Sequence, residues 1–459
     1  MSNVVNIIYA QNEKVTGNAA VQQYVDQQQA AFCSVLIGDV QYVVLKEQKK
    51  PSLEKVRSIA GDIARHLSEQ KIVEAVVSSE TLKTAFANLD KNNVSTAFAE
   101  GWDLGSYQFL NYKTKEERSK TELQVDGEEA KSYAEIGKIR AAATAFSRDL
   151  MNEVSNVLNP ETYPEVLKMQ LEDKGIEVTV FDQEKIEEME MNGVLTVGRG
   201  SKYKPSFVEL RYKGDETKPL LALVGKGVTF DTGGISLKSG KDLSDMRMDM
   251  GGSAAVAGAM QLLAETKAQV NVVALIPMVE NTIDNTAVLP GEVIHYKNGL
   301  TVQIGNTDAE GRLILADALI RAGELNAEYI VDIATLTGAI VNALGTALGG
   351  VFGDEELSYA MKKIGDENGD FVWPMPLVEE YDKTLSSDYA DMNNISSLNF
   401  GGSITAALFL RRFVPEGSKW LHVDMAGMMS KSKPSGYYAK SATGYGARLL
   451  ADYAVKISE

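Results

Sequence analysis

The hydrophobic pattern over the first 110 residues indicates a small α/β domain. Short apolar runs with strand character alternate there with helical patterns. The runs are residues 4–10, 31–37, 42–45 and 73–77, and the main helical pattern covers residues 53–70. Alternation of this kind is typical of α/β domains. Residues 112–132 are rich in Lys, Glu, Asp and Thr, which predicts an exposed segment or an edge hairpin at a domain boundary.

A long helix is predicted to connect this domain to the rest of the chain. Apolar residues recur at three- and four-residue spacing over residues 133–158, and Asn159-Pro160 ends the pattern. We therefore expect an N-terminal α/β domain at residues 1–130, a connecting helix at 131–158 and a larger C-terminal domain at 159–459.

The C-terminal part reads as a larger α/β domain with a mostly parallel central sheet covered by helices. Five apolar runs with strand character alternate with three helical patterns, which is the signature of βαβ units. The predicted strands are residues 177–181, 220–224, 270–277, 329–333 and 420–424, and the predicted helices are residues 164–174, 253–266 and 313–322. Ligands of such sheets bind outside the carboxyl ends of the strands.

Composition and charge narrow the classes of protein and partner. The 459 residues carry a net charge of −17, which disfavours a nucleic-acid partner or an anionic membrane surface. A single cysteine, Cys33, excludes an intramolecular disulfide and a thiolate zinc site and fits a reducing compartment. Residues 1–6 lack the charged and apolar regions of a secretory signal. The uncharged stretch 333–353 is diluted by Thr, Asn and Gly, so we expect a buried element, no membrane partner and a cytoplasmic location.

The candidate catalytic and metal-binding residues lie in loops of the C-terminal domain. Lys226 and Asp231 follow the strand at 220–224 among glycines, and Lys238 lies in the same loop region. Asp249 directly precedes the helical pattern that begins near residue 253.

A third group of charged residues precedes the helical pattern at 313–322. In an extended segment Asp308, Glu310 and Arg312 would share one face, whereas a helix would scatter them. The three histidines, His66, His295 and His422, have no second candidate ligand beside them, and we expect them to be structural.

Each carboxylate group, taken alone, can also be explained without a metal, as part of a solvated loop or as an acidic residue at a helix N-terminus. Four carboxylates converging on one cleft would repel one another and raise their pKa values unless cations lay between them. Two divalent ions with lysine and arginine nearby would resolve this repulsion. The residues by themselves thus indicate a two-metal hydrolase, and they leave its substrate open.

The segment Asn-Thr-Asp-Ala-Glu-Gly-Arg-Leu at 306–313 resembles the signature of the leucine aminopeptidase family, the M17 peptidases, which are cytosolic two-metal exopeptidases. The resemblance extends over residues 145–459. It also rests on the loop 226–234, on Lys238, on the Asp-Met-Gly-Gly at 249–252, on Ala-Thr-Leu-Thr-Gly at 334–338 and on Ile-Thr-Ala-Ala-Leu at 404–408.

The resemblance implies a set of metal ligands and two bound divalent metal ions, with zinc or manganese expected and cobalt or magnesium compatible. One metal would be held by Lys226, as a neutral amine, together with Asp231, Asp249 and Glu310. The other would be held by Asp231, Glu310 and Asp308, including the backbone carbonyl of Asp308.

The resemblance also implies a mechanism and a substrate. Lys238 would polarise the scissile carbonyl, and Arg312 would hold a bicarbonate ion that acts as general base. A free α-amine would bind a metal, so only N-terminal residues would be removed. The side chain of that residue would contact an adaptable apolar lining suited to leucine, formed by Met246, Thr335, Gly338, Ala426 and Met429; plain core packing is the alternative for the two methionines.

The resemblance further implies a homohexamer acting on peptides in the cytoplasm. The alternatives are a non-catalytic family member with a structural or nucleic-acid-binding role, and a different two-metal hydrolysis such as that of phosphoesters. Residues 279–283 depart from the common family form, and we expect them to touch no proposed ligand. Residues 430–441 form a longer stretch than in many bacterial members, which bears on the shape of the predicted side-chain pocket.

Overall fold

The computed structural model describes residues 4–116, 119–240 and 242–459, and the chain divides into two compact units. The N-terminal unit comprises Met1–Ala145, Glu367–Gly369 and Lys431–Ser441, and the C-terminal unit comprises the remainder. The division at residue 145 lies between the expected boundaries at 130 and 158. The two later segments were not expected in the N-terminal unit.

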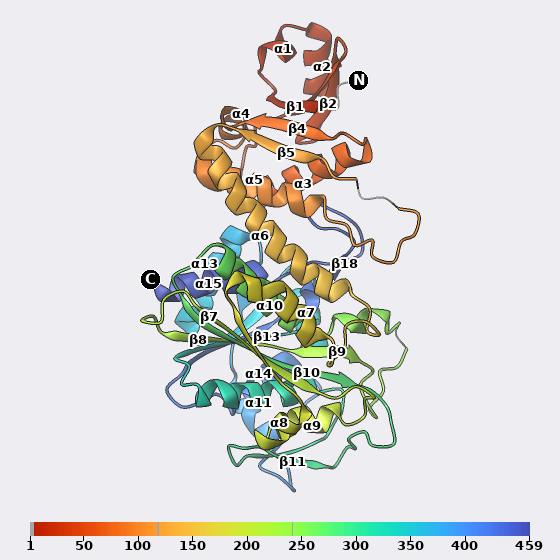
Figure 1. Cartoon of the computed structure of the whole chain (residues 1–459), viewed down its shortest axis with the longest axis vertical. Helices are drawn as coiled ribbons and strands as arrows, with labels where there is room; N and C mark the ends of the chain where they lie inside the picture. The colour runs from red at the N-terminus through yellow and green to blue at the C-terminus, as the bar shows by residue number, and fades with distance from the viewer. Residues whose placement is uncertain (1–3, 117–118, 241) are drawn as a thin grey trace. The chain divides into compact units, whose positions relative to one another are not determined.

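The N-terminal unit is built on a five-stranded sheet in the order β2-β3-β1-β4-β5. Strands β3, β1, β4 and β5 are parallel, and β2 pairs antiparallel to β3 at one edge. Helices α3 and α5 cover one face and α1 and α2 the other (Figure 1). The bounds are β1 Val4–Tyr9, α1 Glu13–Thr16, α2 Ala19–Gln27, β2 Phe32–Ile37, β3 Val40–Leu45, α3 Leu53–Glu69, β4 Glu74–Ser78, α4 Ser79–Ala85, α5 Lys91–Gly105 and β5 Glu122–Asp126.

Helices α3 and α5 approach each other through glycines. A Cβ on Gly105 would lie 2.3 Å from the Cα of Gly61, and a Cβ on Gly101 would lie 2.2 Å from the backbone oxygen of Arg57. Only glycine permits this distance between two helix backbones. Phe98 and Trp102 of α5 fill the core beside the contact.

The polar stretch 112–132 forms an edge strand and not a hairpin. Within it, β5 pairs in parallel with β4, from Glu74 opposite Glu122 to Ser78 opposite Asp126. Residues 117 and 118 lie outside the described residues. The helix that follows is α6, Glu128–Asn152, which begins and ends several residues before the predicted helix 133–158.

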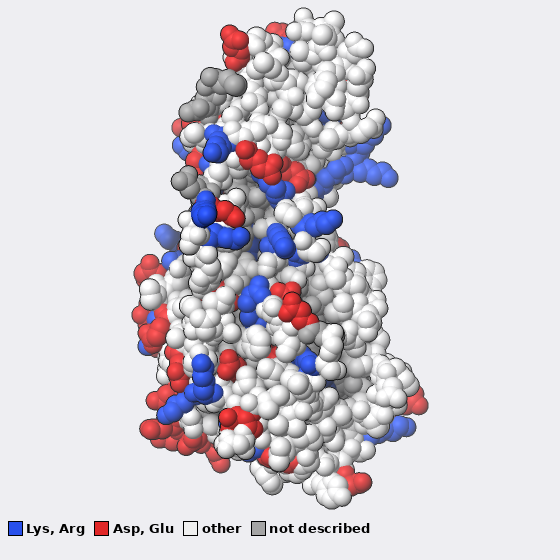
Figure 2. All heavy atoms as spheres, turned by 90° about the vertical axis from the view of Figure 1, so that its right-hand side faces the viewer, with Lys and Arg blue, Asp and Glu red and all other residues white. Residues whose placement is uncertain are grey.

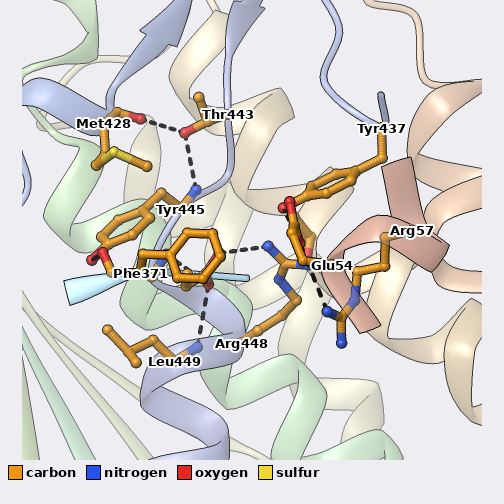
Figure 3. A network of polar contacts seen from close by, with 12 residues as sticks. Glu54, Arg57, Phe371, Met428, Tyr437, Thr443, Tyr445, Arg448 and Leu449 are labelled. Carbon is orange, nitrogen blue, oxygen red and sulfur yellow. Dashed lines mark hydrogen bonds and ion pairs between the residues drawn. The ribbon is translucent and has the colours of Figure 1, made fainter. Parts of the chain in front are cut away.

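The late segment Lys431–Ser441 belongs to the N-terminal unit because its backbone bonds to α3. The amide of Gly436 donates to Asp62 Oδ1 at 2.9 Å, and Arg65 Nη2 donates to the carbonyl of Gly436 at 2.7 Å. Tyr437 is fully buried and donates its hydroxyl to Glu54 Oε2 at 3.2 Å (Figure 3). The sequence linked this segment to the shape of the substrate pocket. Within its unit, the segment packs on helix α3.

The C-terminal unit contains a nine-stranded mixed sheet with a parallel centre, in the order β15-β14-β17-β13-β8-β10-β7-β6, with β9 paired to β10. Strands β17, β13, β8 and β10 are parallel, while β7 and β6 continue antiparallel. The bounds are β6 Glu177–Phe181, β7 Ser206–Lys213, β8 Leu220–Gly225, β9 Gly227–Asp231, β10 Asn271–Asn281, β13 Tyr329–Ala334, β14 Gly349–Gly353, β15 Val372–Pro374 and β17 Lys419–Asp424. The predicted α/β class, with a smaller N-terminal and a larger C-terminal domain, is confirmed.

Helices cover both faces of the central strands. Helices α10 and α15 pack on one face, and α11 and α14 lie on the other (Figure 1). Their bounds are α10 Gly251–Glu265, α11 Gly311–Glu324, α14 Gly402–Arg411 and α15 Ala447–Ser458. Every residue of β10 is buried, as expected of a strand covered on both faces.

The remaining elements complete the described chain. They are α7 Tyr163–Leu171, η1 Glu172–Lys174, α8 Gln183–Glu188, α9 Asn192–Gly198, η2 Ser244–Met248, β11 Val293–His295, β12 Thr301–Gln303, α12 Gly338–Leu344, α13 Glu355–Asn368, η3 Glu379–Leu385, β16 Met392–Asn393, η4 Ala426–Met428, β18 Ser430–Lys431 and β19 Ser441–Ala442. The uncharged stretch 333–353 comprises the end of β13, α12 and β14. Among the described residues, no helix has the length and apolar character needed to span a membrane.

Charged side chains of both signs are interspersed on the face shown in Figure 2. The coloured residues of this face show no separation into one basic and one acidic area, and the chain as a whole is acidic at −17.

Candidate metal centre

The charged residues of the three predicted loops come together at the carboxyl end of the central strands. Lys226 stands in a break between β8 and β9, where its amide donates to the carbonyl of Ile333 at 3.2 Å. Strand β8 ends at Gly225, one residue beyond the predicted end at residue 224, and the chain then resumes pairing with β10 and carries Asp231 to the end of β9.

Two turns supply the other carboxylates. Asp249 follows η2 immediately before α10, and Asp308 lies in the turn before α11. Glu310 is the N-cap residue of α11.

Each lysine of the cluster bridges two carboxylates. Lys226 Nζ lies 2.7 Å from Asp249 Oδ2 and 2.8 Å from Glu310 Oε1. Lys238 Nζ lies 2.7 Å from Asp231 Oδ2 and also forms an ion pair with Asp308. The structure therefore brings together all the metal-ligand candidates named from the sequence, together with Lys238.

The donor set fits divalent cations. Asp231, Asp308 and Glu310 can each direct one carboxylate oxygen to a common point, since these atoms lie within 4.8 Å of one another. Glu310 Oε2 is buried and has no hydrogen-bond partner among the described residues. A buried carboxylate oxygen without a partner is costly unless a cation binds it. Carboxylate donors suit Mg²⁺ and Mn²⁺ and also bind Zn²⁺.

Burial and mutual repulsion perturb the titration of the cluster. Burial raises the pKa of Asp249 well above its usual range, although Lys226 opposes this shift. Burial likewise raises the pKa of Asp308 and of Glu310, and in each case the charge of Asp231 adds to the effect. Burial disfavours the charged form of Lys226, yet the surrounding carboxylates outweigh it and raise the pKa of this lysine.

The segment that carries Arg312 is not extended, which was one of the two conformations considered from the sequence. Residues 307 and 308 form a turn and α11 begins at Gly311, so Asp308, Glu310 and Arg312 do not share a face of an extended strand. The Nη1 of Arg312 donates to the carbonyl of Asn394 at 2.8 Å, and burial lowers the pKa of the guanidinium to about 10. Its Nε is buried and has no hydrogen-bond partner among the described residues.

Asn281, which was not a site candidate from the sequence, contacts a proposed ligand directly. Its Nδ2 donates to Asp231 Oδ1 at 2.8 Å and to the carbonyl of Thr307 at 3.0 Å. The expectation that residues 279–283 touch no proposed ligand is therefore wrong. The available signal was a polar Glu280-Asn281 pair at the carboxyl end of a long apolar strand.

The residues predicted to contact the substrate lie on segments next to the cluster. Thr335 is buried, and its hydroxyl donates to Asp249 Oδ1 at 2.8 Å. Gly338 is exposed at the start of α12, with no atom within 4 Å of an added Cβ. Ala426 begins η4, and its amide donates to Asp424 Oδ1 at 3.3 Å.

The two methionines lie in or directly after short helical turns. Met246 is part of η2, and Met429 follows η4; both are partly buried. The carbonyl of Met429 accepts the amide of Thr443 at 3.1 Å, and Thr443 Oγ1 donates to the carbonyl of Met428 (Figure 3). Tyr445 extends this network through its hydroxyl, which donates to the carbonyl of Phe371 at 3.0 Å.

Asp424 holds two of these segments together. Its carboxylate is fully buried and accepts the amides of Leu336 and Ala426 at 3.2 and 3.3 Å. It also accepts the hydroxyl of Thr337 at 2.6 Å. The turn after β13 and the turn after β17 are thus fixed to one side chain.

His422 forms a buried pair behind the site. Its Nδ1 lies 2.5 Å from Asp332 Oδ1, and Trp420 Nε1 donates to the other oxygen of that carboxylate at 2.7 Å. Burial disfavours the imidazolium, but Asp332 outweighs it and raises the pKa of His422. His66 contacts Ser34 Oγ at 2.8 Å in the N-terminal unit.

The fold and the cluster together define an α/β protein whose carboxylates gather at the carboxyl end of its central strands, and comparison with known proteins gives its family. The model for the cytosol aminopeptidase family, catalytic domain, matches residues 145–451, and that for the N-terminal domain of the family matches residues 40–116. The chain belongs to the cytosol aminopeptidase family, M17, and is thus an enzyme of a metal-dependent family of hydrolases.

Relatives support this assignment over most of the chain. The chain is 37% identical to a probable cytosol aminopeptidase of Persephonella marina, over 91% of this chain and 85% of the relative. It is 39% identical to one of Rickettsia canadensis, over 90% and 85%. The bottromycin maturation enzyme BotP in complex with Mn superposes with a TM-score of 0.89 at 29% identity, over the whole of both chains.

Proposed function

We propose that this protein is a metal-dependent aminopeptidase that removes the N-terminal residue from peptides, with preference for leucine and other apolar residues. The observation that carries the proposal is the convergence of Asp231, Asp308 and Glu310 on one point in an enzyme of the cytosol aminopeptidase family.

We infer two divalent ions per chain. Lys226, Asp231, Asp249 and Glu310 would hold one, and Asp231, Asp308 and Glu310 the other. When bound, such ions supply a water of lowered pKa and polarise a carbonyl. Zinc or manganese is proposed first, and the manganese complex of BotP supports manganese as the probe. Lys226 has to give up its proton to ligate, and the charge of adjacent dications favours that loss.

Lys238 is proposed as the electrophile because it is accessible. Its side chain is 20% exposed, whereas that of Lys226 is 3% exposed. The carboxylates around Lys238 outweigh its burial and raise its pKa, which keeps the ammonium charged at neutral pH. A charged donor at the mouth of the cluster can stabilise the oxyanion that forms on the scissile carbonyl.

Arg312 is proposed as a clamp for a bicarbonate ion that acts as general base. A group with a pKa of about 10 stays protonated at neutral pH, so the guanidinium does not accept the proton itself. Its buried Nε, without a partner among the described residues, is a donor available to an oxyanion.

Substrate selection is proposed to rest on the segments around Asp424. Gly338 leaves open space at the start of α12, and Ala426, Met246 and Met429 would provide apolar contact to the first side chain. We further propose a homohexamer acting on peptides in the cytoplasm. No described feature favours a non-catalytic or nucleic-acid-binding role over this one.

The first test is initial-rate hydrolysis of a leucyl anilide by the full chain, stripped with a chelator and titrated with Mn²⁺ or Zn²⁺. The same substrate with an acetylated amine is run in parallel. We expect metal-dependent hydrolysis of the free amine and none of the acetylated form. Lack of hydrolysis with either metal would contradict the proposal.

A matched pair of variants tests the role of Lys238. Lys238→Met is expected to lower kcat by about 10²–10³-fold, the usual effect of losing one oxyanion donor. Lys185→Met removes an exposed lysine of α8 that pairs with Glu188 on the surface, and it is expected to retain wild-type kcat. Equal rates for both variants would refute the assignment of Lys238.

A further inference from the structure

Asn281 connects the two loops that carry the proposed ligands Asp231 and Asp308. It ends β10 and is 2% exposed. Its Nδ2 bonds both to Asp231 Oδ1 and to the carbonyl of Thr307, the residue before Asp308. Both partners can only accept, so the amide must present its nitrogen to them.

A register shift places Asn281 opposite Asp231. Strands β9 and β10 pair in parallel with Met278 opposite Gly227 and Val279 opposite Val228. Continued pairing would set Asn281 against Phe230, but the register slips by one residue and Asn281 faces Asp231 instead. Irregularities of this kind re-aim side chains and are frequent beside active sites.

The contact determines which oxygen Asp231 presents to the cluster. Asp231 Oδ1 accepts two N–H groups, from Asn281 Nδ2 and from the amide of Gly233, both at 2.8 Å. Asp231 Oδ2 is the atom that faces Lys238 Nζ. With Oδ1 engaged by two donors, Oδ2 is left for a cation.

The same amide joins the Asp231 loop to the Asp308 loop, and a set of bonds from Thr307 reinforces the junction. Thr307 Oγ1 donates to the carbonyl of Gly233 at 2.6 Å and accepts the amide of Ser236 at 2.8 Å. Gly234 lies so close that an added Cβ would meet Asn281 Oδ1 at 2.8 Å and Thr307 Oγ1 at 2.9 Å. The side chains of Asn281 and Thr307 are therefore packed closely against Gly234.

We propose that Asn281 is a positioning residue of the metal centre. Its amide orients Asp231 so that Oδ2 faces the cations, and it fixes the distance between Asp231 and Asp308. The inference rests on the proposed function, since it concerns the same centre, but it assigns a residue that is not itself a ligand. Groups that orient metal ligands in this way contribute strongly to affinity.

The test measures Mn²⁺ binding to the full chain, using electron paramagnetic resonance of free Mn²⁺ after chelator treatment. Asn281→Ala is expected to raise the Kd for Mn²⁺ by about 10–100-fold. Asn281→Asp keeps the side-chain size but replaces the donor nitrogen with oxygen, and it is expected to weaken binding at least as much. The Mn²⁺ concentration that half-restores activity should rise by the same factor, with kcat recovering at high Mn²⁺.

Asn271→Ala is the matched control. Asn271 begins the same strand and is also buried, and its Nδ2 donates to the carbonyl of Lys218 at 3.1 Å, at the end of β10 away from the cluster. We expect this variant to lose thermal stability comparably to Asn281→Ala and to keep the wild-type Kd for Mn²⁺.

The outcomes separate this inference from the proposed function. Wild-type Mn²⁺ affinity in both Asn281 variants would overturn the inference, even if the wild-type protein hydrolyses the leucyl anilide. Mn²⁺ binding that weakens in the variants, in a protein that hydrolyses no leucyl anilide, would support the inference and refute the proposed activity. A wild-type chain that binds no Mn²⁺ would refute both.

Discussion

Replacement of Gly252 by alanine tests how α10 positions Asp249. Gly252 is the second residue of α10 and packs against the backbone of β13. A Cβ there would lie 2.1 Å from the carbonyl oxygen of Ile333 and 2.9 Å from the amide nitrogen of Lys226. Both contacts are to backbone, so neither can be relieved by a change of rotamer. Restoring a separation of 3.0 Å requires the start of α10 to move by 0.9 Å.

The expected magnitudes follow from this displacement. Overpacking against a rigid backbone costs about 3 kcal/mol, at the upper end of the usual range. Alanine recovers about 1 kcal/mol of helix propensity, which leaves a net loss of about 2 kcal/mol. For a unit of this size the melting temperature falls by about 3 °C. The shift also carries Asp249 away from Lys226, and a misplacement near 1 Å can lower a catalytic rate by about 10²-fold.

The assay combines thermal unfolding with Mn²⁺ binding, each on the full chain. Gly338→Ala is the stability control, because Gly338 begins α12 and nothing lies within 4 Å of an added Cβ. Its melting temperature should equal or exceed that of the wild type. If Gly252→Ala matched the wild type in both melting temperature and Mn²⁺ affinity, the argument that this backbone contact sets the position of Asp249 would be refuted.

Three further predictions concern buried charge, pH and helix packing. Lys226→Met leaves two buried carboxylates without their cation and should lower the stability of the stripped protein by about 3–5 kcal/mol; an unchanged melting temperature would contradict this. Asp332 raises the pKa of His422 above its ordinary value of 6.5, despite burial, so this pair stabilises the fold fully below pH 6.5 and progressively less as the pH rises through the raised pKa. The difference in unfolding free energy between the wild type and His422→Gln should therefore be largest at low pH and should decrease as the pH rises through the raised pKa. A difference that does not depend on pH would contradict the role of the ion pair. Gly105→Ala forces a Cβ to within 2.3 Å of Gly61 Cα and should speed hydrogen exchange in α3 and α5 while leaving Mn²⁺ affinity unchanged; unaltered exchange would show that the two helices can separate freely.

Local patterns in the sequence were sufficient for the fold class and for most ligand candidates. Apolar runs marked β1, β8, β10, β13 and β17 to within a few residues, because burial on both faces imposes a continuous apolar run. The carboxylates and lysines of the cluster fall directly after such runs or before helices, which is where parallel strands bring distant loops to one edge. The signature at 306–313 then indicated the family without any knowledge of the fold.

Only the tertiary structure decided how the segments meet. The slip in register that sets Asn281 against Asp231 depends on how β9 lies on β10, about 50 residues away along the chain. The same holds for the pairing of β5 as a parallel edge strand and for the association of Lys431–Ser441 with α3. Hydrophobic periodicity records which face of an element is buried and not which partner buries it. The family signature therefore pointed to the candidate ligands, whereas the contacts that orient these candidates came from packing between segments far apart in the sequence.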